Sequence, residues 1–137
     1  MNKKVSLFLL LIGLLVLPVA AASADTQPLA LAIGYEQALT LGDLNAMTAL
    51  FAEDAVFINR IGGDAITGQE AIRDALAPWA RPDRTHEIVS LNMNGDEMTI
   101  VVEIADHGIA WGRQTLRAVV EDGLIRLLEP IAFRFLF

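Results

Sequence analysis

The side chains that could carry acid–base or nucleophilic chemistry are few in this sequence. It contains one tyrosine, Tyr35, two histidines, His86 and His107, and no cysteine. After residue 24 there is no lysine, and Ser90 is the only serine. Schiff-base and thiolate mechanisms are therefore excluded for that part of the chain, and acid–base catalysis falls to carboxylates, tyrosine or histidine.

Glu103 is the most conspicuous carboxylate, because it lies in a predicted strand that is apolar on both faces. Its neighbours are Ile100, Val101, Val102 and Ile104. A side chain that points inward would be a buried acid or base with a raised pKa, as is typical of catalytic groups. A side chain that points outward would be solvated or paired with Arg113 or Arg117 on the next strand.

The two histidines do not form a metal-binding pattern. A whole predicted hairpin separates His86 from His107, and the sequence has no His-x-x-x-His spacing. Asp106-His107-Gly108 is more typical of a turn. We therefore expect neither a metal nor a cofactor.

Helices are the first elements expected after residue 24. Pro28 suits a first helical turn, and Gly42 ends the helix. Asp43 is a candidate N-cap for a second, short helix. The apolar positions with helical spacing are Leu31, Tyr35, Ala38 and Leu39 in the first helix, and Leu44, Met47, Leu50 and Phe51 in the second.

A third helix is predicted to follow a short pair of β segments. These segments are residues 55–59 and a return ending at Thr67, with a glycine-rich turn between them. Thr67-Gly68-Gln69-Glu70 has the sequence of a capping box, so the helix is expected to begin there and to run to Trp79. Trp79 then becomes the best candidate for the wall of a pocket.

The rest of the chain is expected to form four long antiparallel strands. The expected strands are His86–Met93, Glu97–Asp106, Trp111–Glu121 and a last one that ends at Phe137, with turns at Asn94-Gly95, Gly108 and Asp122-Gly123. This order indicates an α+β fold in which three N-terminal helices pack on the concave face of a strongly curved antiparallel sheet.

The end of the chain is strongly apolar. Alternation along the last strand places four large side chains on one face, namely Ile131, Phe133, Phe135 and Phe137. We assign them to the core or to a dimer interface, because so long an apolar terminus is not expected to remain exposed.

Residues 1–24 have the pattern of a cleavable secretory signal peptide. Lys3 and Lys4 precede the apolar run Val5–Val19, and Ala22-Ser23-Ala24 supplies small residues for cleavage. A membrane anchor is the alternative, since the uncharged run is just long enough to span a bilayer, although Pro18 favours cleavage. Residues 25–137 would then form one secreted or periplasmic domain with no stable membrane association.

The charge balance narrows the possible partners. The formal net charge is −7, and loss of residues 1–24 would remove both lysines and make it more negative. This charge argues against nucleic acid as a partner. With no cysteine there is no disulfide, so stability must come from packing or from oligomerisation.

Four segments together resemble a known family. They are Tyr35–Leu44 (YEQALTLGDL), Leu50–Phe57 (LFAEDAVF), Gly68–Ile72 (GQEAI) and Asp122–Ile125 (DGLI). They are similar to the SnoaL-like and ketosteroid-isomerase-like branch of the nuclear-transport-factor-2-like superfamily. The resemblance covers essentially all of residues 25–137 and implies a cone-shaped domain with an inner pocket, often dimeric. It is specific for the fold and weak for the reaction.

The resemblance also points to particular residues. Tyr35 matches the tyrosine with which ketosteroid isomerases hydrogen-bond the substrate carbonyl, although it could equally be a core residue. The isomerase's general-base aspartate falls on Asn59, which cannot take up a proton but could orient a ligand or end the strand. The position of the second acid falls near Leu116. Two of the three catalytic residues of ketosteroid isomerases are therefore replaced in this sequence.

The expected function is to bind a small apolar molecule, with a carbonyl or cyclic structure, in the cone pocket. Tyr35, Asn59, Trp79 and Leu116 are the expected ligand-binding residues, and we expect a homodimer. One alternative is an isomerase, cyclase or lyase that transfers protons on a polyketide-like or steroid-like substrate, with Tyr35 and Glu103 as catalytic residues. The other alternative is a dimeric interaction module without chemistry.

Overall fold

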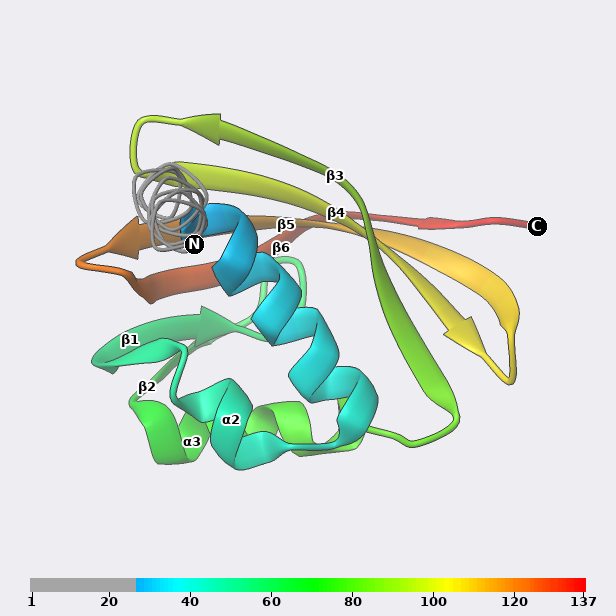
Figure 1. Cartoon of the computed structure of the whole chain (residues 1–137), viewed down its shortest axis with the longest axis horizontal. Helices are drawn as coiled ribbons and strands as arrows, with labels where there is room; N and C mark the ends of the chain where they lie inside the picture. The colour runs from blue at the N-terminus through cyan, green and yellow to red at the C-terminus, as the bar shows by residue number, and fades with distance from the viewer. Residues whose placement is uncertain (1–26) are drawn as a thin grey trace, which may run out of the picture.

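The computed structural model describes residues 27–137 of the chain. The signal peptide predicted for residues 1–24 therefore lies outside the described part. The helices lie on one side of a single curved sheet (Figure 1). The α+β class predicted from the sequence is confirmed.

The sheet has six strands in the order β2-β1-β6-β5-β4-β3. Their bounds are Phe51–Ile58 (β1), Ala65–Thr67 (β2), Arg84–Asn94 (β3), Glu97–Asp106 (β4), Ile109–Glu121 (β5) and Leu124–Phe135 (β6). All neighbours are antiparallel except β1 and β6, which run parallel. The expectation of a wholly antiparallel sheet is corrected by this pair, which forms because β1 docks beside the last strand rather than beside β3.

The sheet bends because its ladders are irregular. Register shifts interrupt β3–β4 at Ile88/Ser90, β4–β5 at Ile104/Ala105, and β5–β6 at Thr115/Leu116 and Val119/Val120. Each extra residue in a ladder bends a strand and increases its local twist. The long strands therefore curve around the helices rather than lie flat beneath them (Figure 1).

The first helix has the apolar face predicted for it. Residues 27–41 are helical, and Leu31, Tyr35, Ala38 and Leu39 are all buried. Gly42 ends the helix in a left-handed conformation, with φ of 70°, which glycine adopts without steric cost.

The second helix is shorter than predicted. Helix α2 spans Leu44–Thr48, and Asp43 caps it by accepting a hydrogen bond from the Ala46 backbone N–H at 3.0 Å. Leu50 and Phe51 do not belong to it. Phe51 begins β1, where it pairs with Ile125 of β6 and is fully buried. Helical spacing alone could not reveal this pairing, because its partner lies far along the chain.

The third helix begins without the predicted capping box. Helix α3 spans Gln69–Leu76, and Gly68 stands at its N-cap with φ of 96° and no side-chain cap. Thr67 ends β2, so its hydroxyl is not the cap. Gln69 instead donates from its side-chain amide to the Phe51 carbonyl at 2.8 Å, which ties the helix to β1. A 3-10 helix, η1 (Ala77–Trp79), continues the element.

The hairpins follow the predicted turns closely. Strand β4 has the predicted bounds, and Asp122-Gly123 forms the β5–β6 turn with positive φ at both residues. The β3–β4 turn differs by one residue, because Asn94 pairs with Glu97 and leaves Gly95 and Asp96 as the loop. That loop still has two residues, so the hairpin itself forms where it was predicted.

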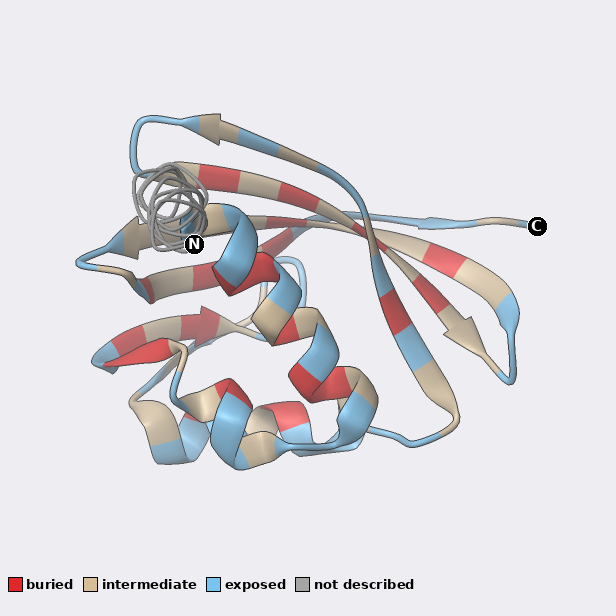
Figure 2. Cartoon of the chain, viewed as in Figure 1, coloured by how far each residue is buried: buried red, intermediate tan, exposed pale blue. Residues whose placement is uncertain are grey.

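The core lies between the helices and the inner face of the sheet (Figure 2). Strand β4 shows the alternation clearly, because Met98, Ile100, Val102 and Ile104 are buried while the residues between them are half-buried. No helix within residues 27–137 is long and apolar enough to cross a membrane.

The apolar end of β6 lies outside this core. Ile131, Phe133, Phe135 and Phe137 are 47%, 36%, 66% and 89% exposed in the single chain. Figure 2 shows this end of the chain as exposed. Their assignment to the core is therefore wrong, because the end of the strand extends beyond the helices that cover the sheet.

Candidate functional site

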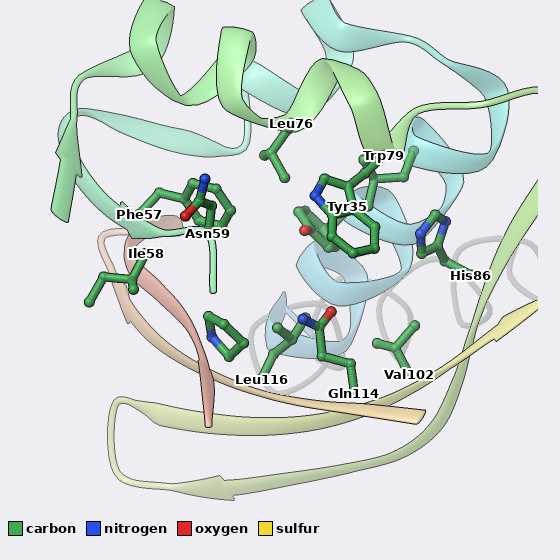
Figure 3. Close-up of a pocket in the computed structure, with 12 residues that line it drawn as sticks. Tyr35, Phe57, Ile58, Asn59, Leu76, Trp79, His86, Val102, Gln114 and Leu116 are labelled. Carbon is green, nitrogen blue, oxygen red and sulfur yellow. The ribbon is translucent and has the colours of Figure 1, made fainter. Parts of the chain in front are cut away.

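A narrow cavity separates the helices from the curved sheet. It is lined by Tyr35, Leu39, Phe57, Ile58, Asn59, Leu76, Trp79, His86, Val102, Gln114, Leu116 and Pro130 (Figure 3). Its volume accessible to water is about 20 Å³, which is enough for about one water-sized group. Four residues predicted from the sequence, Tyr35, Asn59, Trp79 and Leu116, all lie on this cavity.

Tyr35 projects into the inner cavity from the first helix. Its ring is 8% exposed and makes an edge-on contact with Phe51, with 6.4 Å between ring centroids. Burial raises the pKa of the phenol far above its usual value, because the phenolate would lose its hydration. At neutral pH Tyr35 therefore remains a protonated phenol that can donate a hydrogen bond.

His86 is a functional candidate that the sequence did not place in the pocket. It lies on β3 opposite Ile104, is 4% exposed and lines the inner cavity. Neither ring nitrogen has a hydrogen-bond partner in the part of the chain that the structure describes. Burial, together with the nearby positive charge of Arg84, lowers the His86 pKa to about 4. The ring is therefore neutral at pH 7.

Two amide side chains lie where the inner cavity opens. Asn59 directly follows β1 and is exposed, and Gln114 comes from the middle of β5. Both also line a second, outer pocket, as do Trp79 and Pro130. The two hollows are therefore neighbours that share one wall. Gln114 was not predicted, because nothing in the sequence of β5 distinguishes it from a surface residue.

The outer pocket is wider and almost entirely apolar. Its volume accessible to water is about 360 Å³. It is lined by Asn59, Arg60, Ile61, Trp79, Trp111, Gln114, Pro130 and Phe133. Trp111 contacts Phe133 with 5.8 Å between ring centroids and Phe135 with 6.4 Å. Both tryptophans of the chain line this pocket. It is large enough for a small cyclic molecule.

Arg84 holds the two tryptophans in place. Its guanidinium carbon lies 5.5 Å from the Trp79 ring centroid and 5.3 Å from that of Trp111. The guanidinium also forms a bidentate pair with Asp106 at 2.7 and 2.9 Å. This pair lowers the Asp106 pKa to about 2. Cation–π contact and ion pairing together link β3, η1, β4 and β5 at the pocket wall.

Glu103 does not line the cavity, because of the two orientations that the sequence allowed the structure has the outward one, and this corrects its assignment as a catalytic residue. Its side chain accepts hydrogen bonds from the Arg113 guanidinium at 2.9 Å, on the strand directly opposite. The residues on either side of it, Val102 and Ile104, face the core. Alternation along β4 therefore places Glu103 on the outer face of the sheet, away from Tyr35 and His86.

His107 lies in a turn, as its sequence context indicates. It is exposed, has φ of 51°, and its Nε2 lies 3.1 Å from an Asp83 carboxylate oxygen. Within residues 27–137 no group of three or more histidine or acidic side chains is arranged to hold a metal ion.

The curved sheet, the helices on its inner face and the cavity between them define a cone of the nuclear-transport-factor-2-like class. Residues 33–128 match the family described as SnoaL-like domain. The chain therefore belongs to the SnoaL-like domain family, as the resemblance in its sequence predicted.

Solved structures confirm the fold. A candidate polyketide cyclase from Sinorhizobium meliloti is 22% identical, with 74% of this chain and 93% of that chain covered and a TM-score of 0.63. A candidate ketosteroid isomerase from Kribbella flavida is 22% identical, with 76% of each chain covered and a TM-score of 0.61. A Mycobacterium tuberculosis protein is 18% identical, with 80% and 96% covered and a TM-score of 0.66. At these sequence identities the structural similarity establishes only the fold. No curated protein matches the sequence.

Proposed function

We propose that this protein is an exported binding domain that holds a small apolar molecule, cyclic or with a carbonyl group, in the cone. The observation that carries the proposal is the pair of adjoining hollows, an apolar outer pocket and a narrow inner cavity that contains a few polar groups. Apolar pockets with a few convergent polar groups are typical of small-molecule sites. The ring of the ligand would occupy the outer pocket, and its oxygen would point toward Tyr35.

Binding is better supported than catalysis by proton transfer. An isomerase, cyclase or lyase needs a base beside the ligand, and Glu103 is paired with Arg113 on the outer face. Asn59 is an amide, and burial lowers the pKa of His86 to about 4, so its ring is a weaker proton acceptor than an ordinary imidazole. Among residues 27–137 the lining of the cavity includes hydrogen-bonding groups but no carboxylate.

The proposed protein is also exported and dimeric. Export rests on the signal-peptide pattern of residues 1–24. A homodimer is supported by the exposed apolar end of the chain, where Phe135, the last residue of β6, is 66% exposed and Phe137, which lies beyond the strand, is 89% exposed. An apolar surface of this kind is typical of protein–protein contacts.

Titration with 2-indanone, a bicyclic ketone, tests the binding function. We expect it to change the fluorescence of Trp79 and Trp111, because both line the outer pocket. Tyr35→Phe removes the phenol that would donate to the ketone oxygen, so its affinity should fall about three- to tenfold, as expected for one hydrogen bond. Glu103→Gln is the control on the outer face and should leave the affinity unchanged.

Two outcomes would count against this function. If 2-indanone leaves both the fluorescence and the melting temperature of the wild-type protein unchanged, the pocket does not bind such molecules. If wild type and Tyr35→Phe bind it equally, Tyr35 has no part in recognition and belongs only to the core.

A further inference from the structure

His86 lines the inner cavity with a ring whose two nitrogens are both unpaired, and this calls for a ligand of a particular kind. The imidazole of His86 is 4% exposed, and both of its nitrogens are sealed from solvent with no hydrogen-bond partner in residues 27–137. Buried polar atoms in folded proteins are rarely left unpaired, because each loses its hydrogen bonds to water. A pair of such atoms on one ring that lines a cavity therefore indicates a partner that enters the cavity.

The chemistry of the ring defines that partner. A neutral imidazole carries one N–H donor and one lone-pair acceptor, whichever tautomer forms. The acceptor nitrogen needs a donor, and the protonated phenol of Tyr35 on the same cavity can donate one hydrogen bond and accept another. A hydroxyl group both donates and accepts, whereas a ketone oxygen only accepts.

The dimensions of the two hollows define the rest of the ligand. The inner cavity has space for about one water-sized group, which fits a hydroxyl but not a ring. The outer pocket is apolar, holds about 360 Å³ and shares Asn59, Trp79, Gln114 and Pro130 with the inner cavity. A ring in the outer pocket can therefore extend one polar atom past Trp79 and Gln114. Figure 3 shows these two side chains reaching toward the same space from η1 and β5.

We propose that the site selects cyclic apolar alcohols, and that His86 is the residue that distinguishes their hydroxyl from the oxygen of the matching ketone. The inference rests on the proposed binding function and adds the ligand class to it. In the complex the hydroxyl donates to one His86 nitrogen and accepts a hydrogen bond from the Tyr35 phenol. With the lone-pair nitrogen of His86 facing the cavity and the N–H on the other side of the ring, a ketone accepts from Tyr35 but leaves that lone pair unpaired.

Three probes with one carbon skeleton test this preference: 2-indanol, 2-indanone and indane. Their dissociation constants are measured on the purified protein by tryptophan fluorescence. We expect wild type to bind 2-indanol about tenfold more tightly than 2-indanone, because a buried acceptor left unpaired weakens the ketone complex. Indane, which has no oxygen, should bind most weakly of the three.

Variants of His86 assign the preference to the imidazole. His86→Leu has similar volume and no polar atom, so the alcohol-to-ketone ratio should fall to about one. His86→Gln keeps a donor and an acceptor, should retain part of the preference, and provides the test if the leucine variant does not fold. Ser90→Ala, an exposed position on the same strand, is the matched control and should keep the wild-type ratio.

The outcomes separate this inference from the binding function. If wild type binds the alcohol and the ketone equally, or if His86→Leu keeps the tenfold preference, the inference is wrong although the pocket still binds apolar rings. If none of the three probes binds, the binding function is itself wrong, and the inference fails with it.

Discussion

His86 makes the stability of the fold sensitive to acid. Its imidazole has an ordinary pKa of 6.5 in the unfolded chain and about 4 in the folded protein, mainly because it is buried. Between these values the unfolded chain binds a proton that the folded protein does not. The contribution to stability is therefore fully present above about pH 6.5 and is lost as the pH falls toward 4.

This loss can be measured and assigned to one residue. Urea unfolding at pH 7.5 and at pH 4 should show a decrease in the free energy of unfolding of about 3 kcal/mol from His86. His86→Leu should remove that part of the decrease, whereas His107→Gln should retain it because His107 is exposed. An identical pH dependence in wild type and His86→Leu would show that the imidazole titrates normally in the folded protein.

At the residue scale, the sequence located the cavity but not all of its polar groups. Helical spacing predicted that Tyr35 faces inward, and the family resemblance pointed to Asn59 and Leu116. His86 could have been found by following the alternation of the β3–β4 hairpin, since it lies opposite the buried Ile104. Glu103 fails as a catalytic residue under the same rule. For Glu103 the sequence left both faces open, and the burial of Val102 and Ile104 on either side of it decides for the outer face.

At the element scale, Arg84 is the connection on which the pocket wall depends. It lies between Trp79 of η1 and Trp111 of β5. Its ion pair with Asp106 joins the start of β3 to the end of β4. The Arg84 side chain is only 13% exposed, so this pair is less screened by water than a surface ion pair. These contacts join elements that follow one another in the chain, but they depend on where single side chains point, which helix and strand patterns alone do not predict.

Replacement of Arg84 should weaken the fold and loosen both indoles. Arg84→Met leaves Asp106 without its bidentate partner and should lower the free energy of unfolding by more than the loss of an exposed ion pair does. The tryptophan emission should also move to longer wavelength as water reaches the rings. Arg84→Lys keeps the charge but not the planar fork, so we expect an intermediate loss.

The matched control is the neighbouring Arg81, which pairs with Asp83 but has a side chain that is 50% exposed. Arg81→Met should change the stability by less than about 1 kcal/mol, as expected for an exposed ion pair. Equal effects of Arg81→Met and Arg84→Met would show that the contacts of Arg84 with the two tryptophan rings add nothing to the stability of the fold.

At the scale of the whole molecule, the apolar end of β6 is the feature that a single chain does not explain. Strand alternation correctly placed Phe133 and Phe135 on one face, and their rings lie 5.0 Å apart. The sequence could not show that the helices stop short of them. Strand β1 pairs with β6 only as far as Leu128, so within residues 27–137 the later part of β6 has β5 as its single neighbour in the sheet. A second copy of the chain would cover this surface.

Oligomeric state tests that proposal directly. We expect sedimentation equilibrium to give a dimer for the wild type, and Phe135→Glu to raise the dissociation constant of the dimer at least about tenfold, because it places a charge in an apolar contact. Leu41→Glu is the matched control, since Leu41 is 79% exposed at the end of the first helix, remote in sequence from β6. A monomeric wild type, or equal dissociation in both variants, would show that the β6 terminus does not hold two copies together.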